Sequence, residues 1–172
     1  MFNGVQGEKF TGLTAVYVTE LGKDTMESYR RIYSCNRHRV YALAFWMTDN
    51  ELAAEQVMEQ AFIRAFSISS LPTEEIIDCA LLETIRQSTP IGVLTLEQDT
   101  CTEVLSARRN VKRVDLERAV VKLPATERLI YLLHDGEGYD HERIAFTLGI
   151  SENNSRLGLH QARLALRTLL AA

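Results

Sequence analysis

Polar side chains suited to nucleic-acid contact gather near the C-terminal end of this 172-residue chain. Arginine, asparagine and glutamine can pair with the edges of guanine and adenine, and they also contact phosphate oxygens. A serine at a helix start lies beside backbone N–H groups that can hold a phosphate, although capping the helix is an equally simple role. The candidate DNA-binding residues are Ser151, Asn153, Asn154, Arg156, Gln161 and Arg163, and the alternative is a solvated helix face.

The charge of the chain restricts how it can bind nucleic acid. It carries 19 Lys and Arg against 23 Asp and Glu, a formal net charge of −4. Such a chain is not expected to coat nucleic acid by electrostatics alone. Residues 151–170, however, hold three arginines against the single acid Glu152. A DNA contact must therefore come from this local basic face or through a larger partner.

The elements that would position these side chains are helices. Apolar spacing predicts helices over 114–123, 124–134, 140–148 and 151–170. Asp140 and Ser151 are typical N-caps, and Gly149 suits the left-handed residue of a sharp turn between two helices. Residues 114–172 are thus predicted to form a helix-turn-helix domain, with a core that includes Leu159, Leu166 and Leu169.

The preceding part of the chain predicts a second helical unit. Helical periodicity covers 24–47, a second helix continues the hairpin to 67, and a third covers 74–87. Residues 1–23 are an N-terminal extension with one strand-like run at 13–18. Residues 88–113 are a linker that ends in a basic cluster. The predicted fold is all-α: an N-terminal bundle (24–87) joined by a flexible linker to the C-terminal domain (114–172).

No pattern indicates an enzyme, a cofactor or a metal. The four histidines are not placed at metal-ligand spacing from acids or thiols, and no Gly-rich phosphate loop is present. Acidic residues around Gly136 and Gly138 lack the order of a calcium loop. Cys35, Cys79 and Cys101 are odd in number and widely spaced, as expected of reduced thiols. Apolar runs are too short to span a membrane, so we expect a cytoplasmic protein.

Two blocks of the sequence resemble the small bacterial sigma factors of the extracytoplasmic-function (ECF) group. The first block lies within residues 29–66 and includes Val40-Tyr-Ala-Leu-Ala44, Ala54-Glu55 and Phe62-Ile-Arg-Ala-Phe66. The second includes Leu123-Pro124, Arg128-Leu-Ile-Tyr-Leu-Leu133, Glu142-Arg-Ile-Ala145, Leu148-Gly-Ile-Ser151 and Leu159-His160. The order and separation of the blocks are more specific than any one fragment.

The resemblance implies that the chain binds core RNA polymerase and directs it to promoter DNA, with its last helix in the major groove. It further implies that the second helix of the hairpin docks on the polymerase. The candidate docking residues there are Glu55, Val57 and Glu59. An anti-sigma factor is a further partner that such a protein could have.

The chain departs from the family pattern in the helix that captures melted promoter DNA. Residues 72–86 contain four acids, Glu74, Glu75, Asp78 and Glu83, against Arg86, and no aromatic residue. An acidic surface opposes binding of a phosphate backbone. In the last helix, Ser155 occupies an inward position, and Gly158 and Gln161 stand where basic residues are usual. We therefore expect altered promoter melting and altered promoter reading.

Two other functions are also compatible with the sequence. A sigma-like interaction protein could keep the fold but lack promoter opening, acting as a decoy for an anti-sigma factor or as a polymerase-bound regulator. The acidic helix favours this alternative. A generic helix-turn-helix regulator with a dimerising N-terminal bundle would explain the C-terminal domain but leave the resemblance of the first block as coincidence.

Overall fold

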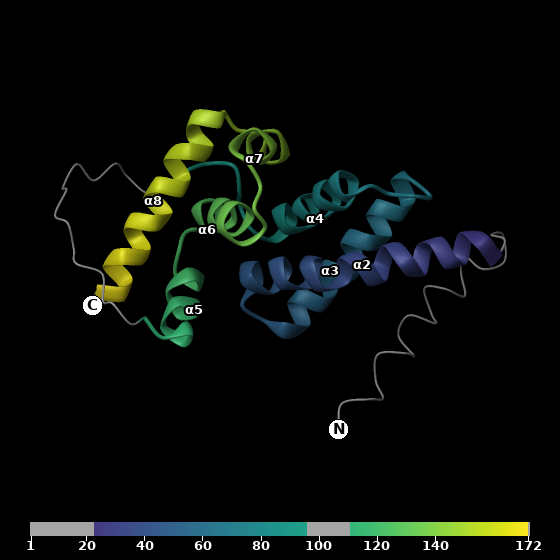
Figure 1. Cartoon of the computed structure of the whole chain (residues 1–172), viewed down its shortest axis with the longest axis horizontal. Coiled ribbons are helices and arrows are strands. Elements are labelled where there is room, and N and C mark those ends of the chain that lie inside the picture. Colours follow the sequence, from purple (N-terminus) through teal and green to yellow (C-terminus); the bar gives the residue numbers. More distant parts are fainter. Residues whose placement is uncertain (1–22, 96–110, 172) are drawn as a thin grey trace, which may run out of the picture.

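In the computed structural model, residues 23–95 and 111–171 are described, and every regular element within these ranges is a helix (Figure 1). The prediction of an all-α fold is confirmed. The strand-like run at 13–18, Cys101 and most of the linker with its basic cluster lie outside the described residues.

The N-terminal half consists of α2 (Lys23–Thr48), α3 (Glu51–Ile68) and α4 (Glu74–Ser88). The predicted helices agree with these bounds to within a residue or two. The reversal between α2 and α3 is short because Asn50 caps α3, its side-chain oxygen accepting a hydrogen bond from the Ala53 amide at 2.9 Å. The helices α2 and α4 both pack on α3. The buried apolar residues include Val40, Leu43, Ala44, Ala54, Val57, Ala61, Phe62, Ile77, Leu81 and Ile85.

The C-terminal half contains α5 (Arg113–Val121), α6 (Ala125–Tyr131), α7 (His141–Leu148) and α8 (Glu152–Ala171). The helix predicted over 124–134 instead changes after α6 into one π-helical turn, Leu132–Gly136. Asp140 caps α7 through the Arg143 amide at 2.7 Å, as predicted. Gly149 has a φ of +69°, the left-handed conformation expected of the turn into α8.

The core of the C-terminal half lies between α5, α6, α7 and α8. Its fully or nearly buried side chains include Val120, Leu123, Leu129, Ile130, Ile144, Leu148, Leu159, Ala162 and Leu166. The predicted core residue Leu169 is wrong, since it is 37% exposed near the end of α8. The other two predicted core residues, Leu159 and Leu166, are buried, as helical spacing predicted.

The two halves pack against each other, and the expectation of two modules on a free tether needs correction. Helix α2 contacts α5 and α6, and α4 contacts α7, in the centre of Figure 1. Buried apolar residues of both halves belong to one continuous cluster. The described start of the linker is also hydrogen-bonded to the C-terminal half. The Gly92 amide donates to Thr126 Oγ1 at 3.2 Å, and the Thr95 amide donates to Glu127 Oε1 at 2.6 Å.

Candidate nucleic-acid interface

The start of α8 presents polar side chains to solvent. Ser151 caps the helix, its hydroxyl oxygen accepting a hydrogen bond from the Asn154 amide at 3.1 Å. Asn153, Asn154 and Arg156 are exposed, and Arg156 forms an ion pair with Glu152 one turn earlier. The turn at Gly149 and the cap at Ser151 therefore hold an exposed group of amide and guanidinium donors at the helix start.

Two other predicted contact residues lie in different environments. Gln161 is only 6% exposed, contrary to the expected exposed position, because α8 is covered by α5, α6 and α7 and its buried face is broad. Arg163 is exposed but is held by Asp135 of the π-helical turn, with nitrogen–oxygen distances of 2.6 and 3.1 Å. The structure thus groups Ser151, Asn153, Asn154 and Arg156 together and separates the other two from them.

Histidines lie beside this surface. The His141 Nδ1 is 3.0 Å from the buried Ser155 hydroxyl, and the ring stacks on His134 with 4.8 Å between centroids. Burial, with additional repulsion from His134 and Arg156, holds the pKa of His141 below its ordinary value. His141 is therefore neutral at neutral pH, and the positive charge at the helix start comes from arginine.

Gly158 is buried because α8 approaches its neighbours closely. A Cβ atom at this position would lie 2.6 Å from Ile130 Cδ1 and 2.8 Å from Leu94 Cδ2. The interpretation of Gly158 as a missing basic contact is therefore wrong, since a long side chain would not fit. Ser155 is fully buried, as its predicted inward position requires.

A second candidate surface lies on α3. Glu55 and Glu59 are exposed, as docking residues must be, but Val57 is 9% exposed and belongs to the core. Val57 points inward because α3 lies between α2 and α4. The exposed apolar residue on the glutamate face is instead Leu52, which is 64% exposed and lies three residues before Glu55. Sequence reasoning missed Leu52, although helical spacing places it with the two glutamates.

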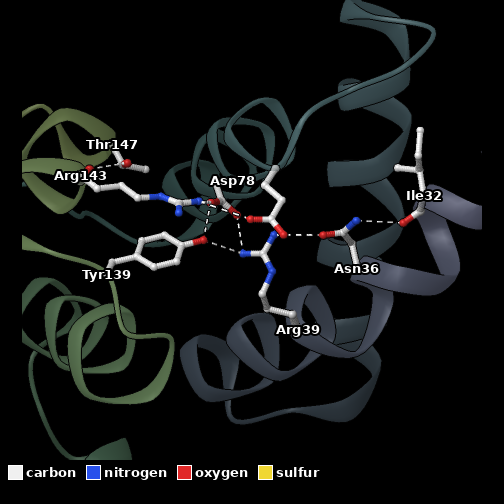
Figure 2. A network of polar contacts seen from close by, with 8 residues as sticks. Ile32, Asn36, Arg39, Asp78, Tyr139, Arg143 and Thr147 are labelled. Atoms are coloured by element: carbon white, nitrogen blue, oxygen red, sulfur yellow. Dashed lines mark hydrogen bonds and ion pairs between the residues drawn. The ribbon is translucent and has the colours of Figure 1, made fainter.

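One of the acids that made α4 look like a repelling surface is buried. Asp78 is 4% exposed and accepts hydrogen bonds from Arg39 of α2 at 2.5 Å, Tyr139 at 2.6 Å and Arg143 of α7 at 3.1 Å. Figure 2 shows these side chains converging from three segments. Burial and the hydrogen bond to Asp78 raise the pKa of Tyr139 well above its ordinary value, so the phenol stays protonated and donates.

Two of the three remaining acids of α4 also lie beside arginines, and Glu75 is exposed. Glu83 pairs with Arg64 of α3 at 2.5 Å, and Glu74 lies 3.8 Å from Arg143. The expected surface of four acids is therefore corrected to three exposed acids, of which two lie beside arginines. The sequence could not show these pairs, because the partners are 19 to 69 positions apart along the chain.

Within the described residues, no group of three or more His, Cys, Asp or Glu side chains could hold a metal ion. Asp135 and Asp140, which are part of the acidic group near Gly136, serve instead as an arginine partner and a helix cap. Cys35 and Cys79 are exposed free thiols. Among the described helices, none combines the length and apolar character that crossing a bilayer requires.

Parts of the sequence are similar to known proteins. Residues 113–166, which comprise α5 to most of α8, match the family described as Sigma-70, region 4. Over 174 aligned residues the chain is 28% identical to the ECF RNA polymerase sigma factor SigE of Mycolicibacterium smegmatis, covering 92% of this chain and 67% of that protein. The second similarity therefore includes the N-terminal half as well as the helix-turn-helix.

Proposed function

Because the chain belongs to the ECF sigma factor family, we propose that it binds core RNA polymerase and directs it to promoter DNA. The observation that carries this proposal is the exposed polar start of α8, within the segment that matches sigma-70 region 4. The proposed activity is binding, without a catalytic step, a metal or a cofactor, and it takes place in the cytoplasm where polymerase and DNA are found.

On the DNA side, the start of α8 enters the major groove. Arg156, Asn153 and Asn154 supply donors for base edges or phosphates, and the Ser151 end of the helix supports a phosphate contact. Releasing Arg156 from Glu152 requires little free energy, because an exposed ion pair contributes only about 0–1 kcal/mol. Gln161 and Arg163 do not contact DNA in this arrangement. Gln161 is packed in the interior, and Arg163 pairs with Asp135.

On the polymerase side, the proposed surface is the face of α3 formed by Leu52, Glu55 and Glu59. An exposed leucine one turn before two exposed acids supplies an apolar anchor beside charged groups, a combination found in protein interfaces. Charge reversal on this face tests it directly. We expect Leu52→Asp with Glu55→Arg to abolish co-purification with core polymerase, whereas Asp115→Arg on α5 leaves it unchanged. Full retention by the first variant would place the docking surface elsewhere.

A second candidate function is supported by α4. This helix has no aromatic residue to stack on unpaired bases, and its central acid Asp78 is occupied by partners from both halves. A sigma-like interaction protein without promoter opening would fit these features. It would bind polymerase or an anti-sigma factor without starting transcription.

Reconstituted transcription on a matching promoter distinguishes the two functions. Initiation supports the sigma factor, and binding to polymerase or to an anti-sigma factor without initiation supports the interaction protein. In the same assay, Arg156→Ala should weaken promoter binding by roughly 1–3 kcal/mol if it reads a base, or reduce the salt dependence if it holds phosphate. Arg167→Ala, near the other end of α8, is the matched control. Unchanged binding of Arg156→Ala would remove this helix start from the interface.

A further inference from the structure

Two stacked histidines lie beside the start of α8, and the contacts proposed above do not use them. His134 belongs to the π-helical turn and His141 is the first residue of α7, and their rings stack with 4.8 Å between centroids. The His141 Nδ1 lies 3.0 Å from the hydroxyl of Ser155, the buried neighbour of Arg156 in α8. Three segments therefore meet at one pair of imidazoles next to the proposed DNA surface.

Hydrogen bonds orient both rings. The His134 Nδ1 is 2.8 Å from Asp135 Oδ1, and the same carboxylate accepts from Arg163. In His141 the Nδ1 position is taken by Ser155, so an added ligand would have to use Nε2. A serine hydroxyl can donate to a neutral imidazole or accept from a charged one. Ser155 therefore suits His141 in either protonation state.

The charges around His141 come from two packed segments and from its own helix. They are His134 and Asp135 of the π-helical turn, Glu152, Arg156 and Arg163 of α8, and Asp140 and Glu142 beside it in sequence. The carboxylates of Asp135 and Glu152 are each paired with an arginine. Burial and repulsion from His134 therefore dominate, and they hold the pKa of His141 below its ordinary value.

A phosphate held by Arg156 reverses this balance. It brings a negative charge next to Ser155 and hence close to His141. Arg156 must also leave Glu152 to reach the phosphate, and the freed carboxylate then attracts a proton to His141. Both changes favour the imidazolium, which donates from both ring nitrogens. The neutral ring of the free chain therefore becomes a cation when a phosphate is present to pair with it.

We propose that His141 takes up a proton from solvent when DNA binds and then donates from Nε2 to a backbone phosphate, as a further DNA-contact residue. Ser155 and His134 are positioning residues: the buried hydroxyl accepts from Nδ1, and the stacked ring fixes the plane of the imidazolium. The inference rests on the proposed function, because DNA supplies the phosphate. Since binding consumes a proton, the affinity rises as the pH falls from the pKa of His141 in the complex to its pKa in the free chain.

Calorimetry of the full chain with a mixed-sequence DNA duplex at low salt measures the proton uptake. Phosphate contacts do not depend on sequence, so this probe suffices. At about pH 6.5, the heats in two buffers with unequal ionisation enthalpies give the number of protons taken up. We expect the wild type to take up about half a proton to one proton more than His141→Gln, whose amide can bond to Ser155 but cannot titrate. His38→Gln, an exposed histidine of α2, is the matched control and should equal the wild type.

The pH profile of the affinity separates a phosphate contact from a packing role. At about pH 8.5, where His141 is neutral with or without DNA, His141→Gln should bind the duplex within about twofold of the wild type. Between that pH and about pH 6, the wild type should gain about three- to tenfold more affinity than the variant. An equal loss of affinity at every pH would mean that the imidazole only packs α7 on α8, and would overturn the proposal.

Nuclear magnetic resonance of the wild type keeps the test valid if His141→Gln disturbs the fold. The pKa of the His141 imidazole, titrated in the free chain and with the duplex bound, should be higher in the complex. An unchanged pKa would overturn the proposal while leaving DNA binding by α8 intact. If the wild type does not bind the duplex at any pH, the DNA side of the proposed function fails, and this inference fails with it.

Discussion

The interior of each half and the boundary between the halves differ in what holds them together. Inside the C-terminal half, α7 and α8 pack through fully buried side chains such as Ile144 and Ala162. At the boundary, the named contacts are hydrogen bonds from arginine and tyrosine, centred on Asp78 and on the carbonyls at the end of α2. Apolar burial defines the fold of each half and continues across the boundary, where these polar contacts are added to it.

This difference has an energetic consequence. Removing a buried apolar side chain loses the hydrophobic transfer free energy and leaves a cavity, whereas a hydrogen bond exchanged for water changes stability by only about 0.5–1.5 kcal/mol. We therefore expect the loss of a buried apolar side chain inside a half to reduce the free energy of unfolding more than the loss of a polar contact at the boundary. The first two of four substitutions, taken from the largest expected effect to the smallest, test this order directly.

Ile144→Ala should cost about 2–5 kcal/mol of stability, because Ile144 of α7 is fully buried and the cavity cannot be filled by solvent. Chemical denaturation followed by circular dichroism measures the loss. Phe146→Ala on the same helix is the matched control, since Phe146 is 80% exposed and should change stability by less than about 0.5 kcal/mol. Equal effects of the two variants would mean that α7 does not pack as described.

Arg128→Lys should cost about 1–3 kcal/mol, less than the loss of Ile144. The Arg128 guanidinium donates to Val121 and Leu123 carbonyls at the end of α5, and to Trp46 and Met47 carbonyls at the end of α2. An ammonium group keeps the charge but cannot reach both helix ends at once.

Arg118→Lys on exposed α5 provides the control for Arg128→Lys in the same denaturation experiment. If Arg128→Lys destabilised the chain more than Ile144→Ala, polar contacts at the boundary would outweigh apolar packing. The order expected from the comparison would then be reversed.

Gly158→Ala should cost about 0.5–2 kcal/mol. The added methyl group would overlap Ile130 Cδ1 and Leu94 Cδ2, and Ile130 is fully buried with little room to move. A gain of roughly 0.5–1 kcal/mol in helix propensity offsets part of this strain. Gly136→Ala is the control, because a Cβ there meets nothing within 4 Å. If Gly158→Ala stabilised the protein, the Leu94 side chain would have to move away at little cost, and its contact with α8 would not hold the start of the linker in place.

The sequence predicted local features well because their causes are local. The caps at Asp140 and Ser151, the turn at Gly149 and the inward position of Ser155 depend on neighbours within a few residues. Helical spacing also aligns Val57 with Ala54 and Ala61, which are buried, so its choice as a docking residue conflicted with its position on the helix.

The features that the sequence did not reveal depend on distant partners. Asp78 looked like a surface acid because Arg39 and Tyr139 are 39 and 61 positions away. Gly158 looked like a lost basic contact because Leu94 and Ile130, which require the small residue, belong to other segments. Helical periodicity identifies a buried face but not which helix covers it, and the width of that face on α8 is what buries Gln161.

The ion pair between Asp135 of the π-helical turn and Arg163 of α8 should contribute least and should depend on pH. Hydrogen bonding from Arg163, together with His134, holds the pKa of Asp135 below its ordinary value despite partial burial. A carboxylate with a lowered pKa in the folded state adds stability above its unfolded pKa, near 3.9, and that stability is lost as the pH falls through the folded value. Because the pair is exposed, Asp135→Asn should cost at most about 1 kcal/mol at neutral pH, and less in acid. Denaturation of both proteins across this range measures the difference, and a difference that grows in acid would contradict the lowered pKa.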